Sequence, residues 1–92
     1  MISESETHDA AVEALDSLPS WARERLGECA VIVEDSHPEG LMGIYDPIGG
    51  VRRIVIFRDE NPNAAEVRRT VLHEVGHHFG MGEEQLEELG YG

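Results

Sequence analysis

Two histidines and two acids near the end of the sequence have the types and the spacing of a metal-dependent hydrolytic site. Residues 73–83 read HEVGHHFGMGE, so His73, Glu74 and His77 form an H-E-x-x-H motif, and Glu83 follows ten residues after His73. Histidines four apart lie on one face of a helix, so both imidazoles can reach one ion. Glutamate next to the first histidine is typical of a general base that takes a proton from water at the metal.

A turn and an acid follow the second histidine. Gly80 comes three residues after His77, where glycine suits a left-handed cap that ends the helix and turns the chain back. Glu83 could then return to the ion as the third ligand, with Glu84 as the alternative. Acids also favour the first turn of a helix, and residues 83–89 have the pattern of a short one. An i, i+4 histidine pair can also be a polar helix surface without a metal. We interpret the pattern as a Zn²⁺ site made by His73, His77 and Glu83, with Glu74 as the base.

The histidines require a helix that begins near Asn61 and Pro62, an N-cap followed by proline at the first helical position. Apolar residues along this helix form one stripe by helical phase, at Ala64, Val67, Val71, Leu72, Val75 and Phe79. His73 and His77 fall outside the stripe, and His78 falls at its edge. We therefore expect His78 to be a packed residue that supports the site rather than a ligand.

Periodicity elsewhere predicts further helices over 7–18 and 21–26, with Ser20 as a cap and Gly27 as the stop. Strands are predicted over 29–34, 41–45 and 51–57, the last with a second half that is apolar on both faces and hence central. Residues 1–6 are expected to be disordered, and residues 46–50 to form a turn. Helices packed on a small mixed sheet of about three or four strands make an α+β fold, and residues 1–92 are expected to form a single domain.

Composition excludes several classes of function. The net charge is -12, with seven arginines and no lysine, so the chain should repel nucleic acid and anionic membranes. No apolar stretch reaches the ~18 residues of a membrane span, and the polar start is not that of a signal peptide. Cys29 is the only cysteine, which favours a reducing cytoplasm and a buried strand position. Trp21 is expected to be a core anchor, and His8 and His37 are expected to be surface residues.

The segment from Val67 to Gly92, which contains the motif, closely resembles the bacterial family of minimal zincin-like metallopeptidases with an HExxHxxGxx(D/E) arrangement. Weaker similarity extends upstream to residues 14–19, 31–35, 41–45 and 54–58. The resemblance implies a compact zincin-like domain with the metal helix beneath a twisted sheet. It also implies that His73, His77 and Glu83 are the metal positions and that Glu74 is the base. The connection over 46–50 looks shorter than in many relatives.

These observations favour a zinc metallopeptidase that acts on a peptide or protein substrate. The alternatives are a zinc-binding interaction or regulatory domain without turnover and, disfavoured by the acidic charge, a metal-dependent ribonuclease. No histidine follows His78 to stabilise an oxyanion, and Tyr91 is the only downstream candidate. Nine residues follow Glu83, so we expect a shallow site and weak turnover on short or extended peptides. The sequence does not indicate an oligomeric state.

Overall fold

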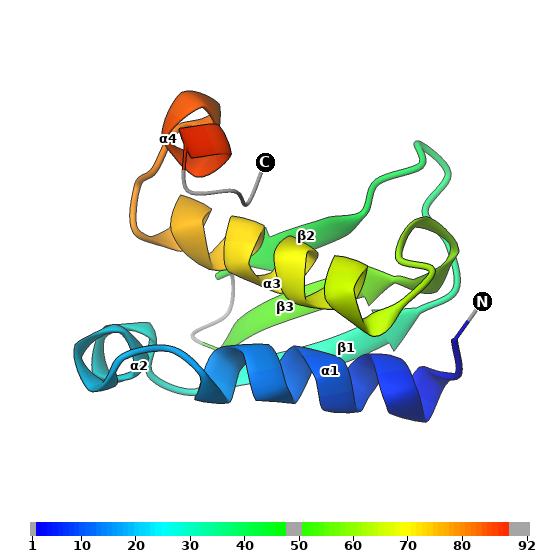
Figure 1. The fold of residues 1–92 in the computed structure, drawn as a ribbon, viewed down its shortest axis with the longest axis horizontal. Coiled ribbons are helices and arrows are strands. Elements are labelled where there is room, and N and C mark those ends of the chain that lie inside the picture. The colour runs from blue at the N-terminus through cyan, green and yellow to red at the C-terminus, as the bar shows by residue number, and fades with distance from the viewer. Residues whose placement is uncertain (1, 48–50, 89–92) are drawn as a thin grey trace.

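The computed structural model describes residues 2–47 and 51–88, without the side chains of residues 85, 86 and 88. Along the chain its elements are α1 (Glu4–Asp16), α2 (Ser20–Leu26), β1 (Cys29–Glu34), β2 (Gly43–Asp46), β3 (Arg52–Phe57), a 3₁₀ turn (Arg58–Glu60), α3 (Ala64–His78) and α4 (Glu83–Glu88). Figure 1 shows the three strands behind α1 and α3. This arrangement confirms the predicted α+β class.

The three strands form one mixed sheet in the order β1-β3-β2. β1 pairs with β3 in parallel, and β2 pairs with β3 antiparallel. β3 is thus the middle strand, as its apolar second half predicted. Ile54 and Ile56 of β3 are fully buried, while Val55 between them is only half-buried. Alternate side chains of a strand point to opposite faces, so Ile54 and Ile56 face the helices.

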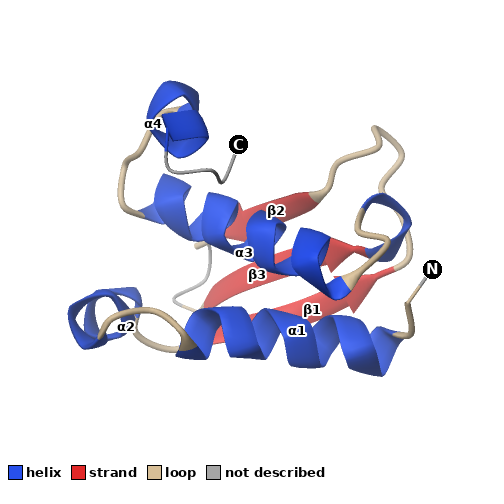
Figure 2. Cartoon of the chain, viewed as in Figure 1, coloured by secondary structure: helices blue, strands red, loops and turns tan. Residues whose placement is uncertain are grey.

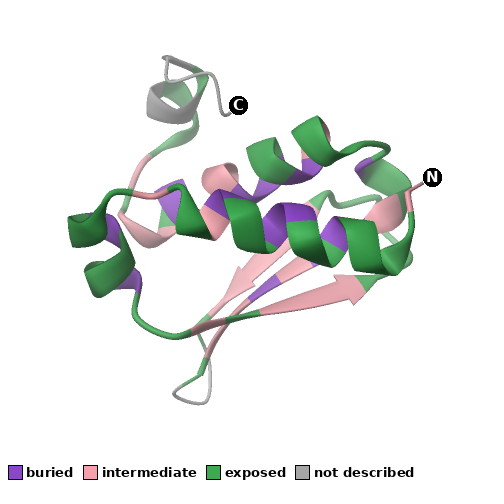
Figure 3. Cartoon of the chain, turned by 60° about the horizontal axis from the view of Figure 1, so that its bottom comes forward, coloured by how far each residue is buried: buried purple, intermediate pink, exposed green. Residues whose placement is uncertain are grey.

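Helices α1 and α3 lie side by side across one face of the sheet (Figure 2). The core lies between these helices and the sheet, as the buried segments on their inner faces show in Figure 3. It consists of small or branched apolar side chains: Ala10, Ala11, Ala14, Leu26, Ile54, Ile56, Val67, Val71 and Val75. Alanines on α1 let that helix approach α3 closely, because interaxial distance depends on the side chains at the contact.

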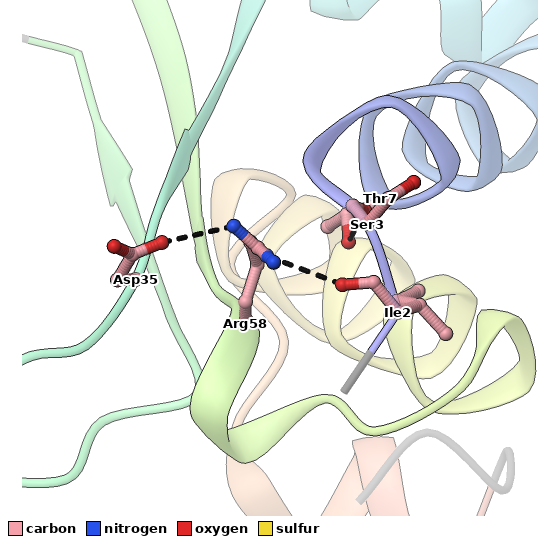
Figure 4. A network of polar contacts seen from close by, with 5 residues as sticks. All are labelled: Ile2, Ser3, Thr7, Asp35 and Arg58. Atoms are coloured by element: carbon pink, nitrogen blue, oxygen red, sulfur yellow. Dashed lines mark hydrogen bonds and ion pairs between the residues drawn. The ribbon is translucent and has the colours of Figure 1, made fainter.

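The first helix begins earlier than the sequence indicated, and the expected disorder over residues 1–6 is wrong for residues 2–6. The Ser3 hydroxyl accepts the backbone N–H of Glu6 and so caps α1. Arg58 then links the first residues to the sheet: its Nε donates to the Ile2 carbonyl at 3.3 Å and its Nη1 to Asp35 at 3.0 Å (Figure 4). These contacts join residues 56 and 23 positions apart, so no local pattern could reveal them.

Two residues have different roles from those predicted. Trp21 is 58% exposed rather than a core anchor, and its ring lies 5.8 Å from that of Phe79. The N-cap of α3 is Asn63, whose side chain accepts the N–H of Glu66. Asn61 is instead fully buried and donates to the carbonyls of Met42 and Phe57.

Smaller corrections concern strand bounds and side-chain burial. The second strand begins at Gly43 rather than at residue 41, and the third begins at Arg52. Cys29 is half-buried in β1, where burial raises the pKa of its thiol and nearby Arg52 lowers it. His8 is exposed, and His37 packs edge-on against Phe57. Part of the predicted turn over 46–50 lies outside the described residues. None of the described helices is long and apolar enough to span a bilayer.

Candidate metal centre

Helix α3 presents the motif residues on the side away from its buried stripe. Val67, Val71 and Val75 are buried in the core, as their phase predicted. His73 is half-buried and His77 is exposed, so the two imidazoles lie at the surface of the domain. The predicted phase of the helix is therefore correct, although Ala64 at its start is exposed rather than part of the stripe.

The end of α3 turns back through a glycine cap. Gly80 has φ +78°, the left-handed conformation expected for it. Its N–H donates to the His77 carbonyl and the N–H of Met81 to the Gly76 carbonyl, each at 3.0 Å. These two bonds make a Schellman motif, which satisfies carbonyls that the helix end would leave free. The chain then reverses, and α4 begins at Glu83.

This reversal brings Glu83 beside the two histidines. Oε1 of Glu83 lies 3.0 Å from Nε2 of His77 and 3.5 Å from Nε2 of His73, and the two Nε2 atoms are 3.0 Å apart. A tetrahedral zinc ion with bonds of about 2.0–2.1 Å needs ligand atoms about 3.3 Å apart. The donor set and its spacing therefore fit zinc. Glu84, the alternative ligand, is exposed and is not a member of this cluster.

A second contact orients the His77 ring. Its Nδ1 lies 3.2 Å from the Met81 carbonyl, and a carbonyl can only accept. Nδ1 therefore carries a proton, and a neutral His77 ring then presents its Nε2 lone pair toward Glu83 and His73. Metal-binding histidines commonly fix their tautomer by donating the other ring N–H in this way. The glycine cap thus positions both Glu83 and the carbonyl that orients His77.

Glu74 lies beside the histidines in a hollow of about 400 Å³ between α3 and the segment that leads into β2. Burial raises the pKa of the Glu74 carboxyl above its ordinary value. The neighbouring His73 and His77 act to lower this pKa, and Glu83 acts to raise it. A carboxyl with a raised pKa is suited to accept and return a proton near neutral pH.

Two residues of β2 that sequence reasoning did not assign to the site support it from the sheet. Gly43 pairs with Ile56 and Tyr45 with Ile54, so both share the face that the helices cover. A Cβ on Gly43 would lie 2.7 Å from Cγ2 of Thr70, so only glycine allows α3 this close. The Tyr45 hydroxyl lies 2.6 Å from Nδ1 of His78, which bears out His78 as a packed residue.

The motif helix, its glycine turn and the small mixed sheet together define a zincin-like domain. Residues 50–92, slightly less than half of the chain, match the family model described as a zincin-like metallopeptidase. This match contains the whole motif and supports the resemblance seen in the sequence. The comparison with curated proteins gives no match.

Proposed function

We propose that the protein is a zinc-dependent metallopeptidase that hydrolyses peptide bonds, with His73, His77 and Glu83 as metal ligands and Glu74 as the general base. The observation that carries this proposal is the spacing of 3.0–3.5 Å among the two Nε2 atoms and Oε1 of Glu83. Three protein ligands that leave a fourth position open are typical of catalytic rather than structural zinc. The family match supports the same reaction class.

Zinc, when bound, supplies a Lewis acid that polarises a carbonyl and makes water more acidic. The chain's own contribution to proton transfer is Glu74. Its carboxylate would accept the proton of the attacking water and return it to the amine that leaves. The position of Glu74 in the hollow, one residue from His73, supports this role, and burial, the largest effect, raises the pKa of its carboxyl above the ordinary value.

An extended peptide could bind along the edge of the sheet beside the site. In the described sheet, β2 pairs only with β3, and its outer edge adjoins the residues that line the hollow. Unpaired backbone groups of an edge strand can bind a peptide as an added strand. Tyr91, the downstream candidate for oxyanion stabilisation, lies outside the described residues. A net charge of -12 disfavours a nucleic-acid substrate.

Metal analysis joined to a peptide-library assay tests the proposal. The wild-type protein should bind one zinc per chain, and His73→Ala with His77→Ala should abolish binding. Glu83→Gln should weaken binding far more than the matched Glu84→Gln, because only Glu83 lies beside the histidines. Glu74→Gln should retain zinc and lose about 10²–10⁴-fold in turnover. Full zinc binding without turnover on any peptide would favour a silent zinc-binding domain instead.

A further inference from the structure

Among the described residues, the hollow beside the candidate metal centre is lined by one arginine, Arg69. Its lining residues in the described structure are Leu41, Met42, Gly43, Arg69, Thr70, His73, Glu74, His77 and Glu83. We propose that Arg69 is an anion subsite that selects peptides with a carboxylate one or two residues from the cleaved bond. This inference rests on the proposed peptidase function and names its substrate class.

Arg69 lies one helical turn before His73 on the same side of α3, about 6 Å along the helix axis. Strand β2 runs beside this helix in the same direction, because Gly43 lies under Thr70 while Tyr45 contacts His78. An extended peptide advances about 3.3 Å per residue. A peptide along the outer edge of β2, beside α3, would therefore pass from the metal site to Arg69 within about two residues.

The guanidinium of Arg69 is available to a ligand. Among the described residues its ion-pair partner is Glu66, at 3.7 Å between Nη1 and Oε2, and the Arg69 side chain is 49% exposed. Exposed pairs of this kind contribute little, typically 0–1 kcal/mol. A bidentate contact with a substrate carboxylate is shorter and stronger. Exchange of Glu66 for such a carboxylate would therefore cost little.

Charge explains why this residue would discriminate among substrates. The protein carries a net charge of -12, and Glu74 and Glu83 lie in the same hollow, so an anionic peptide is repelled unless a cation offsets this field. Arg69 supplies that cation at one end of the hollow. Its neighbour Arg68 is also exposed but does not line the hollow, so it is a matched control for loss of one positive charge.

The test compares zinc-loaded wild type, Arg69→Ala, Arg69→Lys and Arg68→Ala on paired peptides. One pair differs in a free or an amidated C-terminus, and the other in an internal Asp or Asn, so the two sources of carboxylate are separated. In one of the two pairs, we expect the wild type to prefer the peptide with the carboxylate over its neutral partner. The expected preference is about 10- to 100-fold in kcat/KM, which corresponds to a hydrogen bond to a charged group. Arg69→Ala should lose that preference, Arg69→Lys should keep part of it, and Arg68→Ala should keep it fully.

Calorimetric binding of the same peptides to the zinc-loaded Glu74→Gln variant and to its Arg69→Ala derivative gives a readout that does not need turnover. Carboxylate-dependent binding that Arg69→Ala removes would support the subsite. If no peptide is cleaved at the same time, the peptidase proposal fails and the subsite stands. A carboxylate preference that persists in Arg69→Ala, or the lack of any carboxylate preference in both turnover and binding, would overturn the subsite while leaving peptidase activity a separate result.

Discussion

The hydroxyl of Tyr45 and Nδ1 of His78, 33 residues apart in the chain, lie 2.6 Å from each other. The bond joins β2 to the last turn of α3, immediately after the ligand candidate His77, and the two rings also pack edge-on. It therefore fixes the end of the motif helix against the strand that borders the hollow.

We expect Tyr45→Phe to lower the free energy of unfolding by about 1 kcal/mol, because a part-buried hydrogen bond is lost while the ring remains. Urea denaturation of Tyr45→Phe, His78→Ala and the double variant forms a cycle that isolates the pair. A coupling energy near zero would mean that the bond does not contribute to stability.

Gly43→Ala should destabilise the fold by about 1–3 kcal/mol, the usual cost of overpacking. The added methyl would lie 2.7 Å from Cγ2 of Thr70 and 3.1 Å from the Val55 carbonyl, so β2 or α3 must shift. Gly82→Ala is the control, since a Cβ there meets no atom within 4 Å and Gly82 does not have positive φ. Equal melting temperatures for the two variants would contradict this close approach.

Glu74 should give the metal-free protein a measurable pH dependence. Burial raises the pKa of its carboxyl in the folded state, so the folded protein binds this proton more tightly than the unfolded chain does. The stability contributed by Glu74 is then complete below its unfolded pKa and is lost as the pH rises through its folded pKa. Glu74→Gln lacks this titration.

In the presence of a chelator, the melting temperature of Glu74→Gln should therefore rise relative to wild type as the pH increases above about 4, the ordinary pKa of a glutamate. Scanning calorimetry of both proteins across this range measures the difference directly. A difference that stays constant with pH would show that the Glu74 carboxyl has the same pKa in both states.

Asn61→Ala should lower the free energy of unfolding more than Asn63→Ala does. The buried Asn61 amide donates to the Met42 and Phe57 carbonyls, and its oxygen accepts from the Thr70 hydroxyl. The Met42 carbonyl also accepts the Phe57 N–H, so truncation removes the Asn61 partner mainly from the Phe57 carbonyl and the Thr70 hydroxyl, at about 1–3 kcal/mol each. Asn63 is an exposed N-cap, worth about 1 kcal/mol. Chemical denaturation of both variants measures the two losses of stability. A larger loss for Asn63→Ala would contradict the importance of the buried Asn61 contacts.

The sequence by itself determined the features that depend on local periodicity and backbone preference. These include the phase that buries Val67, Val71 and Val75 while His73 and His77 remain outside, and the left-handed turn at Gly80. The apolar second half of β3 also indicated a central strand, because a strand covered on both sides needs no polar alternation.

Only the tertiary structure decided which residues complete the surroundings of the motif. Spacing favoured Glu83 but left Glu84 as an alternative, and the path of the chain after Gly80 brings Glu83 to the histidines. The contacts of Asn61 with Met42 and of Tyr45 with His78 span 19 and 33 residues, and they depend on how β2 packs against α3. Packing geometry of this kind has no signature in local sequence, because it arises from the relative placement of whole elements.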